Sequence, residues 1–215
     1  MSEPNAVLAN GALGLPVVDG LELPQPLRDA LRPDQELIDG GGARRRLPRW
    51  FYRVESWTDA LQVQLTPNFS LWEFMGVDIR EALPLRTFPR YIPCAVTALA
   101  AHLEVFREAV GTYVHVAANG GYRSPAHRLT RDASRHCWGT AANIYRIGDR
   151  FLDDEDAIRH FSAVARSVLP AVWIRPYGPE RGQADDHLHL DLGYTLMEPL
   201  EPVLAEVANG APLNS

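Results

Sequence analysis

The chain has 215 residues and a net charge of −6, and 46% of its residues are hydrophobic. This length and composition suit a globular protein with one domain and an extension, or with two small domains. The acidic balance argues against nucleic-acid binding, which needs a basic surface, and no stretch approaches the roughly 20 apolar residues that span a bilayer.

The first twenty residues, MSEPNAVLANGALGLPVVDG, lack the basic segment and the long apolar segment of a secretory signal. We therefore expect a cytoplasmic protein that is not inserted in a membrane. Cys94 and Cys137 are too few for a disulfide scaffold and are expected to stay reduced. Cys137 adjoins His136, but adjacent side chains in a turn point apart, which argues against a shared metal.

Residues 1–48 are rich in glycine and proline and are interpreted as an N-terminal extension, with at most one short helix before the glycines at 40–42. The basic run ARRR at 43–46 is typical of a solvated turn. Residues 49–208 are expected to form the main domain. It begins with RWFYRVESW and ALQVQLTPNFS, which predict strands or extended segments.

Further along, NFSLWEFMG at 68–76 predicts a short helix, in which Ser70 and Glu73 form a capping box. Apolar residues at helical spacing predict a longer helix over about 94–110, and an acidic start predicts a second over about 155–169. Extended segments follow each helix. The mixed order favours an α+β fold, with an antiparallel sheet that carries the site on one face and has helices packed on the other.

The last predicted strand, DHLHLDLG, alternates with a period of two, which places His187, His189 and Asp191 on one face. Two histidines on one face can converge on one point. A catalytic zinc needs three protein ligands and one open position for water, whose proton a nearby carboxylate accepts. Asp186 supplies such a carboxylate if the strand begins with a bend. His102, His115 and His160 are interpreted as structural, His127 in RSPAHR could line a site, and His136 before a glycine is a further candidate.

Three motifs, GYRSPAH (121–127), SRHCWGTAAN (134–143) and DHLHLD (186–191), occur in this order. Together they resemble the zinc D-Ala-D-Ala carboxypeptidase and peptidoglycan endopeptidase family, which shares its fold with hedgehog domains. The resemblance covers about residues 66–195 and implies a hedgehog-like fold. It does not extend to residues 1–48.

The resemblance also implies roles for individual residues. His136 and His189 match zinc ligands, Asp186 the general base, and His187 an accessory histidine. Arg123 matches the arginine that contacts the substrate and stabilises the oxyanion, and Ser134 matches a serine near the substrate.

Asn143 stands where the family has its aspartate ligand. An amide oxygen is neutral, and asparagine is a poor zinc ligand compared with cysteine, histidine and carboxylates. We therefore expect weakened zinc binding. Asp132 and Asp149 are near in sequence, but no pattern places either of them in the site.

Two functions follow from these residues. The first is a metal-dependent hydrolase of a short peptide or a peptidoglycan-type substrate with D-Ala-D-Ala-like ends. The second is a weakened or inactive family member that binds peptides or cell-wall fragments, and Asn143 is its main support. The sequence does not fix the oligomeric state.

Overall fold

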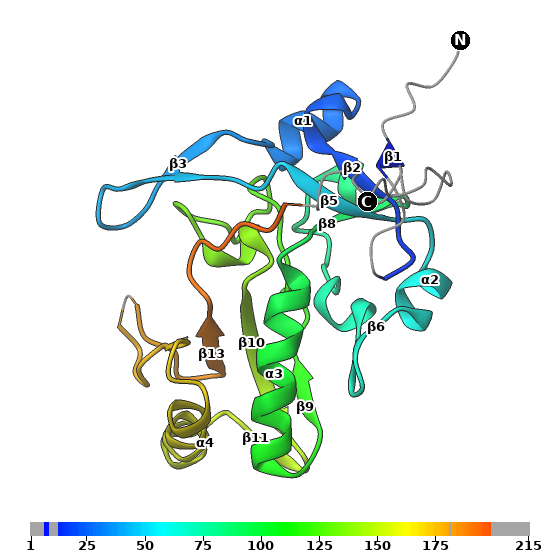
Figure 1. Cartoon of the computed structure of the whole chain (residues 1–215). Coiled ribbons are helices and arrows are strands. Elements are labelled where there is room, and N and C mark those ends of the chain that lie inside the picture. The colour runs from blue at the N-terminus through cyan, green and yellow to red at the C-terminus, as the bar shows by residue number, and fades with distance from the viewer. Residues whose placement is uncertain (1–6, 9–12, 181, 199–215) are drawn as a thin grey trace, which may run out of the picture.

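Two antiparallel sheets organise the structure, a computed structural model that describes residues 7–8, 13–180 and 182–198 (Figure 1). The four-stranded sheet has the order β1 (Val7–Leu8), β2 (Val17–Asp19), β5 (Trp50–Val54) and β8 (Arg90–Pro93). The five-stranded sheet contains β9 (Val114–Val116), β10 (Ala141–Ile147), β11 (Arg150–Phe151), β12 (Trp173–Ile174) and β13 (Leu188–Asp191). In this sheet β10 pairs with β9, β11 and β13.

The described residues form four α-helices: α1 (Gln25–Leu31), α2 (Trp57–Gln62), α3 (Val96–Val110) and α4 (Glu155–Val168). The two long helices, α3 and α4, pack against each other and against the five-stranded sheet. Gly111 ends α3 in a left-handed conformation, and Asp154 caps α4 by accepting a hydrogen bond from the Ala157 N–H. Both helices lie where the sequence predicted them.

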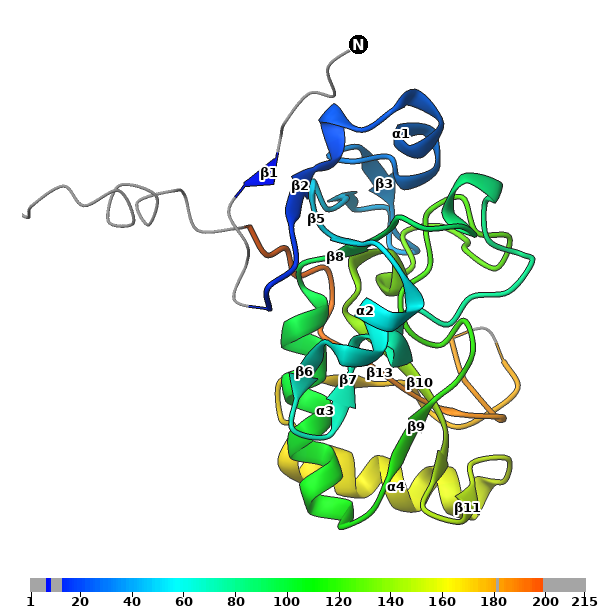
Figure 2. The ribbon, with the colours of Figure 1, turned by 90° about the vertical axis from the view of Figure 1, so that its right-hand side faces the viewer.

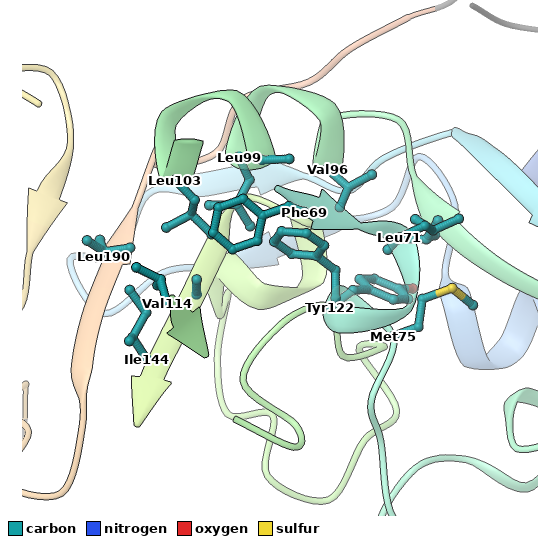
Figure 3. Packing of buried hydrophobic residues seen from close by; sticks show 14 of the residues in the cluster. Phe69, Leu71, Met75, Val96, Leu99, Leu103, Val114, Tyr122, Ile144 and Leu190 are labelled. Atoms are coloured by element: carbon teal, nitrogen blue, oxygen red, sulfur yellow. The ribbon is translucent and has the colours of Figure 1, made fainter. Parts of the chain in front are cut away.

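Part of the main core lies between α3 and this sheet. Figure 3 shows Leu99 and Leu103 of α3 gathered with Val114, Ile144 and Leu190 of the strands. Because side chains alternate along a strand, the neighbours of Ile144 and Leu190 in the sequence face away from this core. The helices therefore cover one face of the sheet and leave the other for polar residues, as the α+β prediction required.

Two hairpins complete the fold: β3 (Glu36–Ile38) with β4 (Arg44–Arg46), and β6 (Gln64–Thr66) with β7 (Phe69–Ser70). Short 3-10 helices cover Gly20–Glu22, Leu71–Phe74 (η2), Leu83–Leu85 and Arg135–Trp138 (η4). In η2 the predicted capping box is present, and the Ser70 N–H donates to Glu73 Oε1 at 2.8 Å.

Three predictions about local structure need correction. The chain forms two larger sheets and not a single one. Residues 60–62 are helical and not extended, since Ser56 caps α2 by accepting from the Asp59 N–H. The ARRR run belongs to a hairpin and not to a turn, because Arg44 and Arg45 form ion pairs with Glu36 and Asp39.

The described part of the 1–48 segment packs on the rest of the chain. Strand β2 pairs with β5, and Val17, Val18 and Leu31 are buried in the main core. Leu47 belongs to a second buried cluster with Trp138. The end of the 49–208 domain prediction lies outside the described residues. Among the described helices, none combines the length and apolar character needed to cross a membrane.

Glu104 of α3 fastens the β6–β7 hairpin to the core. Its buried carboxylate accepts hydrogen bonds from Thr66 Oγ1 at 2.6 Å and from the Asn68 N–H at 3.0 Å, and also from the Asn68 side chain. Burial alone would raise the pKa of Glu104, but these hydrogen bonds outweigh it and hold the pKa below its ordinary value of 4.5.

A carboxyl whose pKa is lowered by folding stabilises the fold above its unfolded pKa, and this stabilisation is lost as the pH falls through its folded pKa. We expect Glu104→Gln to reduce the free energy of unfolding at neutral pH by about 1–3 kcal/mol. The loss should shrink below pH 4.5, the ordinary value. Urea unfolding at several pH values tests this. The exposed Glu108 of the same helix provides the control. If Glu108→Gln shows the same pH dependence, the assignment to Glu104 is wrong.

Candidate functional site

Strand pairing brings two of the predicted metal ligands together. In the β10–β13 register Asn143 lies directly opposite His189, and Asn143 Oδ1 is 2.7 Å from His189 Nδ1. Both residues lie on the sheet face opposite the helices, because their neighbours Ile144 and Leu190 are in the core. The sequence therefore placed this pair correctly, 46 positions apart along the chain.

His136 reaches the same place from η4. Its Nδ1 lies 2.8 Å from the Gly121 carbonyl oxygen, and its ring centroid is 5.3 Å from that of His189. The backbone at Gly121 is closely packed, since a Cβ there would lie 2.5 Å from the Phe74 carbonyl oxygen. Glycine at this position allows the GYRS segment to pass beside Phe74 and to meet His136.

Asp186 and His187 precede β13 in a bend, as the sequence required if Asp186 was to reach the same site as His189. Asp186 Oδ1 lies 2.5 Å from His187 Nδ1, so the carboxylate accepts from this ring nitrogen. His187 Nε2 is buried and has no hydrogen-bond partner among the described residues. The centroids of the His187 and His189 rings lie 6.4 Å apart, so the two rings are near each other although His187 precedes the strand.

A pocket of about 550 Å³ lies over these residues. It is lined by six of the seven predicted site residues: Arg123, Ser134, His136, Asn143, Asp186 and His187. His189 is not in the lining, but it contacts the lining residue Asn143. The structure thus brings the predicted residues to one place. Their chemical roles stay predictions.

Four arginines dominate the charge of this pocket, which we call the arginine pocket. Arg80, Arg123, Arg131 and Arg175 line it, and among the described residues of the lining Asp186 is the one carboxylate. Asp78 pairs with Arg80 and offsets part of this charge. The sequence predicted only Arg123. The others come from separate loops and from the end of β12, and no local pattern marks them as neighbours.

Arg123 and Arg175 are the half-buried members of this set. The Nε of each is buried without a hydrogen-bond partner among the described residues. Burial lowers the pKa of Arg123 to about 10 and lowers that of Arg175 as well. Buried polar groups are almost always paired. The Nε of Arg28, Arg90 and Arg146 is also buried without a hydrogen-bond partner among the described residues, so what distinguishes Arg123 and Arg175 is that both line one pocket, where an anionic ligand can reach them.

The two buried histidines lie in this positive environment. Burial, followed by the charges of Arg123 and His189, holds the pKa of His136 well below its usual range. Burial, followed by the charge of Arg175, holds the pKa of His189 well below its usual range. Both imidazoles are therefore neutral at physiological pH, and the nearby guanidinium groups repel any added cation.

The residues present fit zinc poorly. Two ligands on a tetrahedral zinc lie about 3.3 Å apart, given bonds of about 2.0–2.1 Å. The Asn143–His189 contact of 2.7 Å is shorter and corresponds to a hydrogen bond. The other ring nitrogen of His189, Nε2, faces Asp191 Oδ2 at 3.1 Å. Within the described residues, no group of three or more His, Cys, Asp or Glu side chains could hold a metal ion. Zinc binding stays a prediction that only a metal titration can test.

Other candidates lie outside the pocket. His127 is buried, and its Nε2 lies 3.0 Å from Oδ1 of Asn119. Asn119 lines the pocket, whereas His127 does not. Cys137 is buried in the second cluster, which raises its pKa to about 12. Neither Asp132 nor Asp149 lines the pocket.

Two acidic residues support the site, and the sequence analysis gave neither of them a role. Asp191 lies against His189, and its position on the histidine face of β13 was the available signal. Glu81 accepts hydrogen bonds from the Ser124 N–H at 3.1 Å and from Ser124 Oγ at 2.6 Å, and so fixes the chain next to Arg123. No sequence pattern linked Glu81 to Ser124, 43 positions away.

Comparisons with protein-family models, with curated proteins and with solved structures find no match to this chain.

Proposed function

We propose that the protein binds a short peptide through its carboxylate groups and that the arginine pocket is the binding site. The observation that carries this proposal is the pair of half-buried guanidinium groups at one pocket, Arg123 and Arg175, each with a buried Nε that has no hydrogen-bond partner among the described residues. Arginine binds carboxylates in a bidentate geometry, which gives both affinity and orientation. This matches the peptide-binding function predicted from the sequence, including cell-wall fragments with D-Ala-D-Ala ends.

The neutral groups of the pocket suit the rest of such a ligand. Ser134 and Asn143 offer hydroxyl and amide groups that can bind a peptide bond. His187 presents a buried Nε2 without a partner among the described residues. A peptide that ends in a carboxylate would thus find cationic and neutral polar partners in one place.

The test compares a D-Ala-D-Ala dipeptide carrying a free carboxylate with its C-terminal amide, by isothermal titration calorimetry. We expect the free acid to bind, and we expect Arg123→Met and Arg175→Met each to weaken binding about tenfold or more, because a hydrogen bond to a charged group contributes about 1.5–3 kcal/mol. Arg166→Met is the control, since Arg166 is exposed on α4 and does not line the pocket. Equal binding of acid and amide, or of wild type and both pocket variants, would contradict the proposal.

A second candidate is metal-dependent hydrolysis of the bound peptide. The convergence of His136, Asn143 and His189 beside Asp186 favours it. It depends on the resemblance to the D-Ala-D-Ala carboxypeptidase family and on the hedgehog-like fold that this resemblance implies. Both remain predictions, as does the cytoplasmic location. Zinc titration of Asn143 variants, argued in the Discussion, separates the two candidates.

A further inference from the structure

A second hollow, of about 680 Å³, adjoins the arginine pocket. Residues 113–118, which comprise β9 and its flanks, form one wall, and Trp72 and Glu73 of η2 are also part of the lining. We call this hollow the β9 groove. It shares Ala117, Ala118 and Tyr145 with the arginine pocket, so the two form one continuous surface.

The edge of strand β9 that faces away from β10 is accessible from Val116 onward, whereas Val114 is only 4% exposed. It pairs with β10 (Figure 2), and no strand among the described residues pairs with its other side. The Ala117 N–H donates to the Asn143 carbonyl at 2.9 Å, and the Tyr113 carbonyl accepts from the Gly148 N–H at 2.8 Å. Hydrogen-bonding direction alternates along an antiparallel strand, so the N–H and C=O groups of Val114 and Val116 face away from β10.

Aromatic side chains lie along the same groove. Trp72 and Tyr113 are 44% and 69% exposed, and Tyr145 stands where the groove meets the arginine pocket. Exposed aromatic residues in a groove bind apolar side chains of a ligand. The charges of Glu73 and Arg107 in the lining are opposite in sign, so the net positive charge is concentrated in the arginine pocket.

We propose that the β9 groove binds an extended peptide as an added strand on β9, with the terminal carboxylate of the peptide in the arginine pocket. The proposal rests on the proposed function and extends it from dipeptides to longer peptides. A free strand edge supplies main-chain hydrogen bonds to an extended peptide. The accessible residues 115–118 span about 10 Å at about 3.3 Å per residue, which is enough for about three peptide residues.

The position of the charge sets the direction of the peptide. The arginine pocket adjoins the C-terminal end of β9, at Ala117 and Ala118. A peptide with its C-terminal carboxylate in that pocket runs parallel to β9. Its preceding residues then lie beside Val116, with side chains directed alternately toward and away from the aromatic wall.

The experiment compares a hexapeptide that ends in D-Ala-D-Ala with the D-Ala-D-Ala dipeptide, both with free carboxylates, by calorimetry on the full chain. We expect wild type to bind the hexapeptide about tenfold or more tightly, since the longer ligand adds several main-chain hydrogen bonds. Val116→Pro removes an outward N–H and keeps the bonds to β10, because proline is tolerated where its nitrogen faces away from the sheet. It should bring the hexapeptide affinity close to the dipeptide affinity.

A second variant keeps the test independent of any folding defect in Val116→Pro. Trp72→Ala should weaken the hexapeptide several-fold and leave dipeptide binding unchanged. Trp57→Ala should weaken neither, because Trp57 is equally exposed at 45% but lies outside the groove. Equal affinities of wild type for both peptides would overturn the added strand while leaving the arginine pocket intact. If neither free acid binds, the proposed function fails and this inference fails with it.

Discussion

Replacing Trp138 with alanine should reduce the free energy of unfolding by about 3–5 kcal/mol, the range typical for removal of a large buried aromatic side chain. Trp138 is completely buried, at 0% exposure. Its indole N–H donates to the Arg46 carbonyl at 2.9 Å, and its ring meets the Tyr194 ring edge-on at 4.9 Å. The variant would lose the packing of the ring and leave the Arg46 carbonyl without this donor.

The same change should also disturb the pocket. Trp138 belongs to η4, the short helix that carries His136 and follows Ser134. It is the largest side chain of the second cluster, which joins η4 to Leu47 of the 1–48 segment. Loss of its ring removes the contact that holds η4 in place, so ligand affinity should fall together with stability.

Urea unfolding followed by circular dichroism measures the first effect, and calorimetry with the D-Ala-D-Ala dipeptide measures the second. Trp57→Ala is the control, because Trp57 is 45% exposed and packs on Phe88 and Arg90 far from η4. If Trp138→Ala unfolds at the same urea concentration as Trp57→Ala, the second cluster does not stabilise the fold in the way argued above.

For the 1–48 segment, the sequence predicted local structure but not the contacts with the rest of the chain. Its glycines and prolines predicted an extension, and α1 was the one short helix allowed. Its contacts were not predictable, because Leu47 and Arg46 meet Trp138 about 90 positions away and no periodic pattern links them. Propensity and spacing describe local structure, while such contacts depend on the whole fold.

The candidate site divides in the same way. The two-residue alternation of DHLHLDLG predicted a shared strand face for His187 and His189. Their rings lie 6.4 Å apart, but His187 stands in the bend before β13. Arg175 was missed, because it stands just after β12, a strand of only two residues, and enters the pocket through the pairing of that strand with β13. Site residues that lie close together in the sequence can be recognised from the sequence pattern. Site residues that come from several separate loops cannot.

The last expected result concerns Asn143, and it decides between the two candidate functions. Asn143→Asp should tighten zinc binding by at least about tenfold, or about 1.4 kcal/mol. The carboxylate would add a negative charge beside two neutral imidazoles, in a pocket where Arg123 and Arg175 repel a cation. It would also supply a ligand that zinc prefers to an amide.

Zinc titration by calorimetry, with the melting temperature recorded with and without metal, tests this expectation. The metal should raise the melting temperature of Asn143→Asp more than that of wild type, since a ligand that binds only the folded state stabilises it. Adding His136→Ala to Asn143→Asp should abolish the gain, whereas adding His102→Ala should not, because His102 lies on α3 and contacts the Ala98 carbonyl. Tight zinc binding by wild type would show that asparagine serves as a ligand here, and would favour the hydrolase. If neither form binds zinc, the three residues form no metal site, and the peptide-binding function stands on the arginine pocket alone.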